Sequence, residues 1–324
     1  LNFNQFLLYY FGAFVNFFIG ILLIYFSCKK NKFLDKNIIL ILSLFPVVLL
    51  ELGSYSYDSL LISVAFAVIN YSIYYFYSEK KSKKDLIILI ALCLFLFPIK
   101  TIYFPISLLY IFMLIWSKIK RFYPKFLPHT ILILLGCYGI LYLITLIPGI
   151  PFIHNQGVAI TSNLPSYSIA QIIQNPIRMF YSFLDFIFTL ENLESFLSIF
   201  FVRYDKGVDF SIYKTFIIIL FSSLFLIKNK EEVYKRKDIS FTFIFTFILI
   251  LLFSFFVCVT WNIELSVTIL GFQARYLLPV LPLLFYSTEG LIPEQFTVRY
   301  STVMNYTLIL CYYYLVDMFL RIIF

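Results

Sequence analysis

The sequence predicts an all-α protein, a polytopic bundle of about ten transmembrane helices, from its composition, its apolar runs and its charge distribution. Hydrophobic residues make up 62% of the 324 residues, and charged residues only 13%. Soluble domains are roughly half apolar and about a quarter charged, so this chain needs lipid as the solvent for most of its surface. We therefore predict one transmembrane domain over residues 1–324.

Apolar runs define the candidate helices. A helix that crosses about 30 Å of hydrocarbon, at about 1.5 Å per residue, needs about 20 residues. Two runs, 37–51 and 85–98, are shorter, and we expect them either to tilt little or to end in irregular backbone that lines a cavity. The candidate runs, in chain order, are 6–27, 37–51, 58–77, 85–98, 101–117, 128–148, 212–228, 239–260, 274–288 and 301–322.

The segments between these runs alternate in charge. The set that is rich in Lys and Arg holds 18 of the 25 basic residues, counting Lys228 at its edge. By the positive-inside rule this set faces the cytoplasm, so the net charge of +8 reports topology and not a nucleic-acid partner. The set comprises residues 28–36, 78–84, 118–127, 229–237 and 289–300.

The same alternation places Leu1 on the extracytoplasmic side, because the first run must then cross toward the cytoplasm. A chain that starts outside the cell without a signal peptide needs an earlier membrane helix. We therefore expect at least one further helix and part of an external loop upstream of Leu1.

The long segment 149–211 belongs to the opposite set, and we predict that it is extracytoplasmic and carries interfacial helices. Within 168–187, apolar side chains recur at helical spacing. Pro176 either starts a new helix there or kinks this one. The predicted apolar stripe consists of Ile169, Ile172, Ile173, Ile177, Phe180, Phe183, Leu184 and Ile187.

Three polar clusters lie at predicted external helix ends, and each is a candidate site because polar groups near lipid are costly. The first is 51–59, with the sequence ELGSYSYDS, which carries Glu51, Tyr57 and Asp58. Asp58 suits the start of the next helix, where the helix dipole favours an anion. The alternative interpretation is a solvated turn in which Asp58 caps the helix.

The second cluster is the short turn that carries Lys100 and Tyr103. The turn is so short that Lys100 must lie close to the membrane surface. Its ammonium either binds the phosphate of a lipid headgroup as a point charge or snorkels to the interface.

The third cluster, Gln273, Arg275 and Tyr276, precedes an apolar run that contains two prolines. A guanidinium at this place needs a partner, and it can bind phosphate through two parallel hydrogen bonds. The alternative is an internal salt bridge, for which Glu264, Glu51 and Asp58 are the possible partners.

For the remaining charged residues, histidines and cysteines that we considered, the sequence favours structural roles over functional ones. Asp317 and Arg321 are four residues apart in the last run and are interpreted as a structural pair. The two histidines, His129 and His154, are far apart in sequence, so the sequence predicts no zinc site. It predicts no disulfide framework either, because the cysteines occur singly, at Cys28, Cys93, Cys137, Cys258 and Cys311.

At the three clusters the chain resembles a family of bacterial integral membrane proteins known as domain of unknown function 2142. The segments that carry the resemblance are SYSYDSL at 54–60, PIKTIYFPISLL at 98–109 and GFQARYLLPVLPLL at 271–284. The last is the most specific, because the family typically shows a Gly-Val-Gln-Gly-Arg-Tyr stretch before a proline-containing helix. Ala274 stands here where the family usually has Gly.

That family is similar in layout to the GT-C class of membrane glycosyltransferases, which take a sugar from a polyprenyl-phosphate carrier outside the cytoplasm. The resemblance implies such an enzyme in the bacterial plasma membrane, acting in cell-envelope polysaccharide or teichoic-acid assembly. It implies that Lys100, Tyr103, Gln273, Arg275, Tyr276 and Tyr57 bind the phosphate-linked substrate. A divalent metal at the departing phosphate stays open, with no metal ligands assigned.

The general base is expected upstream of Leu1, because in the GT-C class it commonly follows the first helix. Glu51 and Asp58 are the lesser candidates for this role within the chain. Two other functions stay open. A flippase or exporter of lipid-linked saccharide predicts internal repeats with matching broken helices, and a polysaccharide polymerase predicts a pair of large, basic external loops.

Overall fold

The described part of the molecule is helical, apart from one isolated bridge between Ile227 and Val298. Three of its helices are long and apolar enough to cross a membrane: α1 (Gln5–Lys30), α4 (Tyr57–Tyr77) and the Ser240–Val259 part of α13 (Lys237–Trp261). The all-α fold is confirmed for this part, while a bundle of about ten spans stays a prediction. The computed structural model describes residues 5–31, 37–121, 174, 179, 182–183, 186, 219–220, 222–227, 237–261, 274–288 and 298–323.

The central element is α4, in which most side chains are buried. It packs against α1 on one side and α5 (Lys83–Ile99) on another, and also contacts α7 (Leu109–Arg121). Each of these segments is an apolar run, and in lipid such a run must form a helix to satisfy its own backbone hydrogen bonds.

The contact between α1 and α4 depends on small residues. Ala13, Gly20 and Ser27 lie on the buried face of α1, and a Cβ atom added to Gly20 would lie 2.6 Å from Ser63 Oγ of α4. Small residues let two membrane helices approach closely. The rest of the α1 surface exposes large apolar side chains, as expected of a helix that faces lipid.

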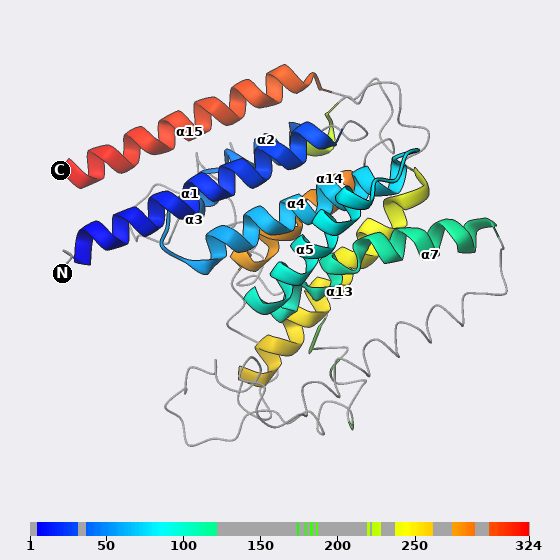
Figure 1. Ribbon diagram of the computed structural model, residues 1–324. Coiled ribbons are helices and arrows are strands. Elements are labelled where there is room, and N and C mark those ends of the chain that lie inside the picture. Colours follow the sequence, from blue (N-terminus) through cyan, green and yellow to red (C-terminus); the bar gives the residue numbers. More distant parts are fainter. Residues whose placement is uncertain are drawn as a thin grey trace.

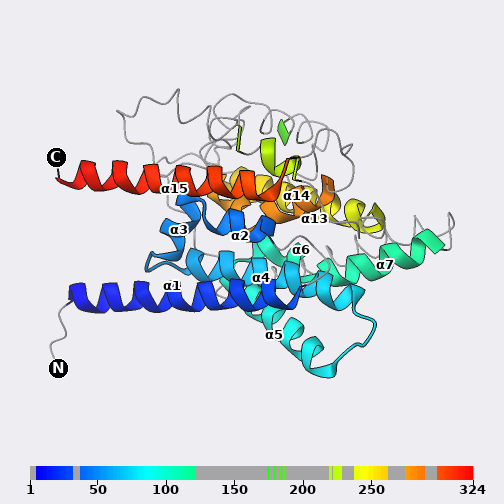
Figure 2. The ribbon, with the colours of Figure 1, turned by 90° about the horizontal axis from the view of Figure 1, so that it is seen from above.

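The run 37–51 forms two short helices, α2 (Asn37–Ser43) and α3 (Pro46–Leu52). The chain breaks before Pro46, because proline has no backbone N–H and its ring clashes with the preceding turn. The Cys311 thiol of α15 (Tyr300–Ile323) contacts the Leu44 carbonyl at this break. The long helices α1 and α15 run side by side in Figure 1, but α2 and α3 lie between them in Figure 2 and contact both.

Two further runs are interrupted near prolines. The run 101–117 is divided into the 3₁₀ turn η1 (Thr101–Tyr103), α6 (Phe104–Ser107) and α7, so the prediction of one continuous helix is wrong there. The run 274–288 starts as the 3₁₀ helix η3 (Ala274–Val280) and continues as α14 (Leu281–Thr288). The prolines of this run indicated such an irregular helix.

The helices place their termini at two distinct ends of the molecule (Figure 1). We call one the lysine-rich end, formed by residues 29–31, 78–85 and 118–121, and the other the cavity end, formed by residues 51–58, 100–104 and 274–280. At the lysine-rich end α1, α4 and α7 finish while α5 and α13 begin, so the described basic segments gather on one side, as the charge alternation predicts.

A few helical residues of the segment 149–211 are described: Gln174, Met179, Ser182, Phe183 and Phe186. Phe183 and Phe186 lie 5.2 Å and 5.4 Å from the Phe255 ring of α13, between ring centroids. This face therefore packs on the core of the bundle, and of its members only Phe183 belongs to the predicted stripe. The other stripe residues and the run 128–148 lie outside the described residues.

Candidate functional site

The start of α4 carries a buried carboxylate. The Ser56 hydroxyl caps the helix by accepting a hydrogen bond from the Asp58 backbone N–H at 3.2 Å. Asp58 therefore lies in the first helical turn, where the dipole favours an anion, and it is only 7% exposed. Ser56 and not Asp58 is therefore the cap, and Asp58 is buried, whereas Tyr55 and Tyr57 of the same turn are exposed.

Serine hydroxyls hold the turn between α3 and α4 in place. Ser54 Oγ donates to the Glu51 carbonyl at 2.7 Å, and Ser59 Oγ donates to the Leu52 carbonyl at 3.1 Å. These bonds add side-chain donors to carbonyls in the last turn of α3, where a helix leaves carbonyls without its regular bonds. They therefore fix the chain between Glu51 and Asp58.

The N-terminal half of α1 supports the same turn. Asn16 Nδ2 lies 3.4 Å from the carbonyl oxygens of Ser54 and Ser56 and donates to both. The Tyr55 ring rests against Gly12, where an added Cβ would lie 2.3 Å from the ring. An amide on a lipid-facing helix is costly unless it is bonded, so this contact explains why Asn16 occurs in an apolar run.

A small cavity of about 10 Å³ lies between the first two polar clusters and η3. Glu51 and Asp58 line it from α3 and α4, and Tyr103 lines it from η1. Its remaining walls are apolar and come from α4 and η3: Leu61, Ile62, Leu278 and Pro279. The structure thus brings together residues that the sequence places at three separate helix ends.

A lysine on aromatic rings lies beside this cavity. Lys100 Nζ is 3.5 Å from the centroid of the Tyr276 ring and 5.6 Å from that of Tyr57. This nitrogen is buried, which is not the arrangement of a lysine that snorkels to the interface. The contact places a positive charge over the ring faces, where it is stabilised electrostatically.

Tyr103 connects the lysine contact to the cavity. Its Oη donates to the Tyr276 carbonyl at 2.7 Å, and its side chain is fully buried. This bond fixes η3 against η1. Lys100, Tyr276 and Tyr103 thus form a continuous set of contacts that ends at the cavity wall.

Two of the predicted binding residues are not among the described parts of the structure. Gln273 precedes the described part of η3, and the side chain of Arg275 is not among the described ones, although its backbone belongs to η3 beside Tyr276. Glu264 and the side chains of Asp317 and Arg321 are likewise outside the described parts. Within the described ranges, His, Cys, Asp and Glu form no group of three that could hold a metal ion.

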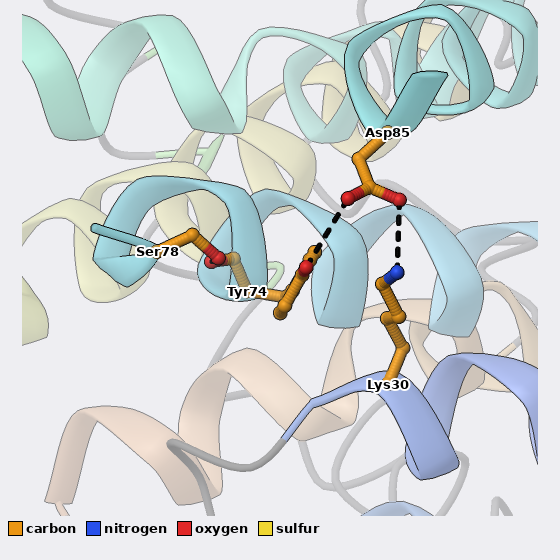
Figure 3. A network of polar contacts seen from close by, with 4 residues as sticks. All are labelled: Lys30, Tyr74, Ser78 and Asp85. Carbon is orange, nitrogen blue, oxygen red and sulfur yellow. Dashed lines mark hydrogen bonds and ion pairs between the residues drawn. The ribbon is translucent and has the colours of Figure 1, made fainter. Parts of the chain in front are cut away.

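Sequence reasoning missed a polar network at the lysine-rich end, which Figure 3 shows. Lys30 Nζ lies 3.0 Å from Asp85 Oδ1, and Tyr74 Oη donates to Asp85 Oδ2 at 3.1 Å. The Ser78 hydroxyl donates to the Tyr74 carbonyl at 2.8 Å. The network ties α1, α4 and α5 together, and the available signal was an acidic residue at the start of an apolar run, next to lysines.

Sequence reasoning also missed a second network, which is formed by amide side chains about one turn of α4 before Tyr74. Asn31 Nδ2 donates to Asn70 Oδ1 at 3.2 Å, and Asn70 Nδ2 donates to Ser27 Oγ at 3.3 Å. All three side chains are buried between α1 and α4. The signal for this contact was Asn70 itself, an amide within the apolar run 58–77, since such groups bond across membrane helices.

Lys81, in the turn after α4, also lies over two tyrosine rings, although its side chain is exposed whereas the Lys100 nitrogen is buried. Its Nζ donates to the Tyr75 carbonyl at 2.8 Å and lies 4.9 Å and 5.7 Å from the ring centroids of Tyr75 and Tyr110. Burial lowers the pKa of the Lys81 ammonium. Lys81 therefore offers a matched comparison for Lys100 at the opposite end of the molecule.

Comparison with known proteins shows a match to one protein family. A family model described as "Predicted membrane protein (DUF2142)" matches residues 3–284, a span that contains every residue of the cavity wall. No curated protein and no solved structure matches the chain.

Proposed function

This chain belongs to the DUF2142 family of predicted membrane proteins, and we propose that it is a GT-C-like membrane glycosyltransferase. Its donor is a sugar on a polyprenyl-phosphate carrier, used on the extracytoplasmic side of the bacterial plasma membrane. Its product enters a cell-envelope polysaccharide or teichoic acid. The single observation that supports this proposal is the cavity lined by Glu51 and Asp58 beside the Lys100 ammonium.

The reaction needs two kinds of group close together. A carboxylate must take the proton from the acceptor hydroxyl as the new glycosidic bond forms. Cationic groups must stabilise the negative charge that develops on the departing phosphate. Glu51 and Asp58 are the described carboxylates that line the cavity, and Lys100 is the cation next to it.

The distribution of charge favours chemistry at one surface over transport. At the cavity end, ionisable groups surround a space, whereas at the lysine-rich end Lys30 and Asp85 close directly on each other. Next to the lysine-rich end α4 buries the neutral amide Asn70, which accepts a hydrogen bond from Asn31 of that end. A flippase would need a continuous polar path between these ends, whereas the buried residues in the middle of α1, Gly20 and Ile24, are apolar.

Binding of undecaprenyl phosphate to the full-length protein in lipid nanodiscs tests the proposal. We expect Lys100→Ala to weaken binding about ten- to hundredfold, because a hydrogen bond to a charged group contributes about 1.5–3 kcal/mol. Lys100→Arg should retain part of the affinity because it keeps the charge. Lys81→Ala is the matched control, since it removes a lysine that also rests on two tyrosine rings.

The same variants, together with Arg275→Ala, should be expressed in the native host and the envelope glycans profiled. Loss of one glycan in Lys100→Ala and Arg275→Ala, with the profile of Lys81→Ala unchanged, supports the function. Unchanged glycans in both Lys100→Ala and Arg275→Ala contradict it.

A further inference from the structure

We infer that the basic turn between α4 and α5 binds anionic phospholipids of the leaflet that the lysine-rich end faces. The lipid phosphate lies among Lys80, Lys83 and Lys84, and an acyl chain lies on the exposed apolar side chains of α5 that follow them. The inference goes beyond the proposed function, because it concerns the end of the molecule opposite to the cavity and depends on no reaction.

Two other lysines at this end already serve contacts within the protein. Lys30 Nζ lies 3.0 Å from Asp85 Oδ1, and this ion pair joins α1 to α5. Lys81 Nζ donates to the carbonyls of Tyr75 and Phe76 at 2.8 Å and 3.3 Å, in the last turn of α4, where a helix leaves carbonyls without its regular bonds. These two ammonium groups therefore stabilise the packing of the helices and the end of α4.

The remaining three lysines of the turn are not held in this way. The side chains of Lys80, Lys83 and Lys84 are exposed, and within the described ranges none of them forms an ion pair or a side-chain hydrogen bond. Glu79 is the one acidic residue among four lysines in the segment 78–84. The turn is therefore a surface of positive charge, and its complement is an anion.

The turn lies at the depth of the lipid phosphates. Helix α4 is long and apolar enough to cross a membrane, and its last turn contains Tyr74, Tyr75 and Tyr77. Tyrosine side chains gather at the interface between membrane and water. The apolar run of α5 starts directly after Lys84, so the lysines lie between two membrane helices at the level where basic side chains attract anionic lipids.

The face of α5 that follows the lysines fits an acyl chain. Ile87, Ile90 and Leu94 are 66%, 49% and 69% exposed. They follow Lys83 at intervals of four, seven and eleven residues, which places all four side chains on one face of the helix. This helix lies at the edge of the described bundle (Figure 2). A cation next to a continuous apolar stripe matches a phospholipid, which has an anionic head and a hydrocarbon tail.

The apolar stripe distinguishes a lipid from a soluble anion. A soluble phosphate ester would contact only the exposed lysines, and exposed pairs of charges contribute little. A phospholipid adds the contact of its chain with α5, and the membrane holds it at a high effective concentration. The partner is therefore a membrane lipid with a negatively charged head group, such as phosphatidylglycerol.

Lipid binding to the full-length protein in dodecyl maltoside micelles tests the inference. The protein is titrated with fluorescent phosphatidylglycerol and with phosphatidylcholine that carries the same chains and label. We expect phosphatidylglycerol to bind at least about tenfold more tightly at low salt, because each lysine near an anionic lipid contributes about fivefold. Most of this preference should disappear at about 1 M salt, which screens the charges. Equal affinity for the two lipids at low salt would overturn the inference.

Charge-matched variants locate the site. Lys83→Gln together with Lys84→Gln should lower the affinity for phosphatidylglycerol at least about fivefold, whereas Lys83→Arg together with Lys84→Arg should retain it because the charges remain. Lys118→Gln together with Arg299→Gln removes two exposed charges from other parts of the chain and should change the affinity by less than about twofold. An equal loss in this control would overturn the inference, because it would show attraction to net charge and not to the turn.

Apolar substitutions and a soluble competitor test the contact with the acyl chain. Ile87→Ala together with Leu94→Ala should lower the affinity about threefold, because both remove apolar surface. Leu308→Ala together with Ile309→Ala, on the exposed face of α15, should leave it unchanged. Displacement by glycerol phosphate as effective as that by unlabelled phosphatidylglycerol would overturn the assignment to a lipid.

A last comparison separates this surface from the proposed donor site. Lys100→Ala should leave the affinity for phosphatidylglycerol unchanged, because Lys100 lies at the cavity end. Lys83→Gln together with Lys84→Gln should in turn leave binding of undecaprenyl phosphate within about twofold of the wild type. Loss of phosphatidylglycerol binding in Lys100→Ala alone would overturn the placement of the lipid at the turn, whereas failure of undecaprenyl phosphate to bind would contradict only the proposed function.

Discussion

The two ends of α4 use the same side-chain types in different arrangements. At the lysine-rich end, Lys30 and Asp85 are 3.0 Å apart, and Tyr74 donates to the same carboxylate. At the cavity end, Glu51 and Asp58 line a small cavity of about 10 Å³. Lysine, carboxylate and tyrosine thus bond directly to one another at the lysine-rich end, whereas at the cavity end the carboxylates line a small cavity and the lysine lies over tyrosine rings.

This difference shows that the residue types alone do not distinguish a ligand-binding site from a structural contact in this membrane protein. A buried carboxylate is costly at either end, and each end meets this cost in its own way. Asp85 meets it with a direct ion pair and a phenol. Asp58 lies in the first turn of α4, where the helix dipole favours its charge.

The largest effect is expected where the two ends are joined, along the contact between α1 and α4. Gly20→Val places a side chain within 2.6 Å of Ser63 Oγ and 3.0 Å of Leu52 Cδ2, both in the core. Overpacking of this kind should lower the free energy of unfolding by about 3 kcal/mol, measured by thermal unfolding in detergent. Because α1 moves away from α4 in this variant, the affinity for undecaprenyl phosphate should fall and the Lys30–Asp85 ion pair should weaken.

Gly12→Val is the control for that substitution. The Tyr55 ring that it meets is 59% exposed and can swing aside, so stability should change by less than about 1 kcal/mol. Equal destabilisation by the two variants would show that close packing at Gly20 does not hold the ends together.

The next effect should be confined to the lysine-rich end. Lys30→Met leaves the Asp85 carboxylate, which is 8% exposed, without its ammonium partner. We expect a loss of about 2 kcal/mol in thermal stability, below the roughly 3–5 kcal/mol for fully buried pairs, because Lys30 itself is 41% exposed. Binding of undecaprenyl phosphate should be unchanged, since the cavity is untouched.

Lys29→Met, at the neighbouring exposed position, should leave stability within about 0.5 kcal/mol of the wild type. If Lys30→Met weakened binding of undecaprenyl phosphate as strongly as Lys100→Ala does, the two ends would not have separate roles in stability and in binding.

Removal of one tyrosine hydroxyl at each end should have a smaller effect on stability and compares the two ends directly. Tyr103→Phe and Tyr74→Phe each remove one phenolic hydrogen bond, to the Tyr276 carbonyl and to Asp85 respectively. Each should lower the free energy of unfolding by about 1 kcal/mol. Only Tyr103→Phe should also weaken binding of undecaprenyl phosphate, because it removes the bond that holds η3 against η1 beside the cavity. Titration of both variants measures this, and equal affinities would contradict it.

The smallest effect concerns Lys81 and pH. Burial lowers the pKa of its ammonium, so the folded state binds this proton less tightly than the unfolded state does. Stability should therefore rise as pH increases from neutral toward the usual range of lysine. Lys81→Met should lack this rise and differ from the wild type by no more than about 0.5 kcal/mol at neutral pH. Thermal unfolding across that pH range would detect a rise that persists in the variant.

Uninterrupted apolar runs were predictable from sequence. The runs 6–27, 58–77 and 239–260 correspond to α1, α4 and α13 within a few residues, because lipid leaves such runs no alternative to the helix. Breaks were harder to predict. Two prolines marked the irregular start at 274–280, whereas the break before Pro46 falls inside a run that composition alone reads as continuous.

Convergence of the three clusters was predictable because charge alternation assigns them to one side of the bilayer. The contacts within the site were not predictable, since Tyr103 and Tyr276 come from distant parts of the chain and meet through packing. Asp85 was missed because its lysine-rich surroundings were interpreted only as a topology signal. The roles of Gln273 and Arg275 stay predictions.

Asn16 makes the bilayer itself part of the geometry of the cavity. Its helix presents Phe11, Phe14 and Phe18 outward while its amide holds the carbonyls of Ser54 and Ser56. Membrane helices answer a change in hydrocarbon thickness by tilting. A tilt of α1 displaces the turn between the two cavity carboxylates, so hydrophobic mismatch in a thinner or thicker membrane alters the spacing between them.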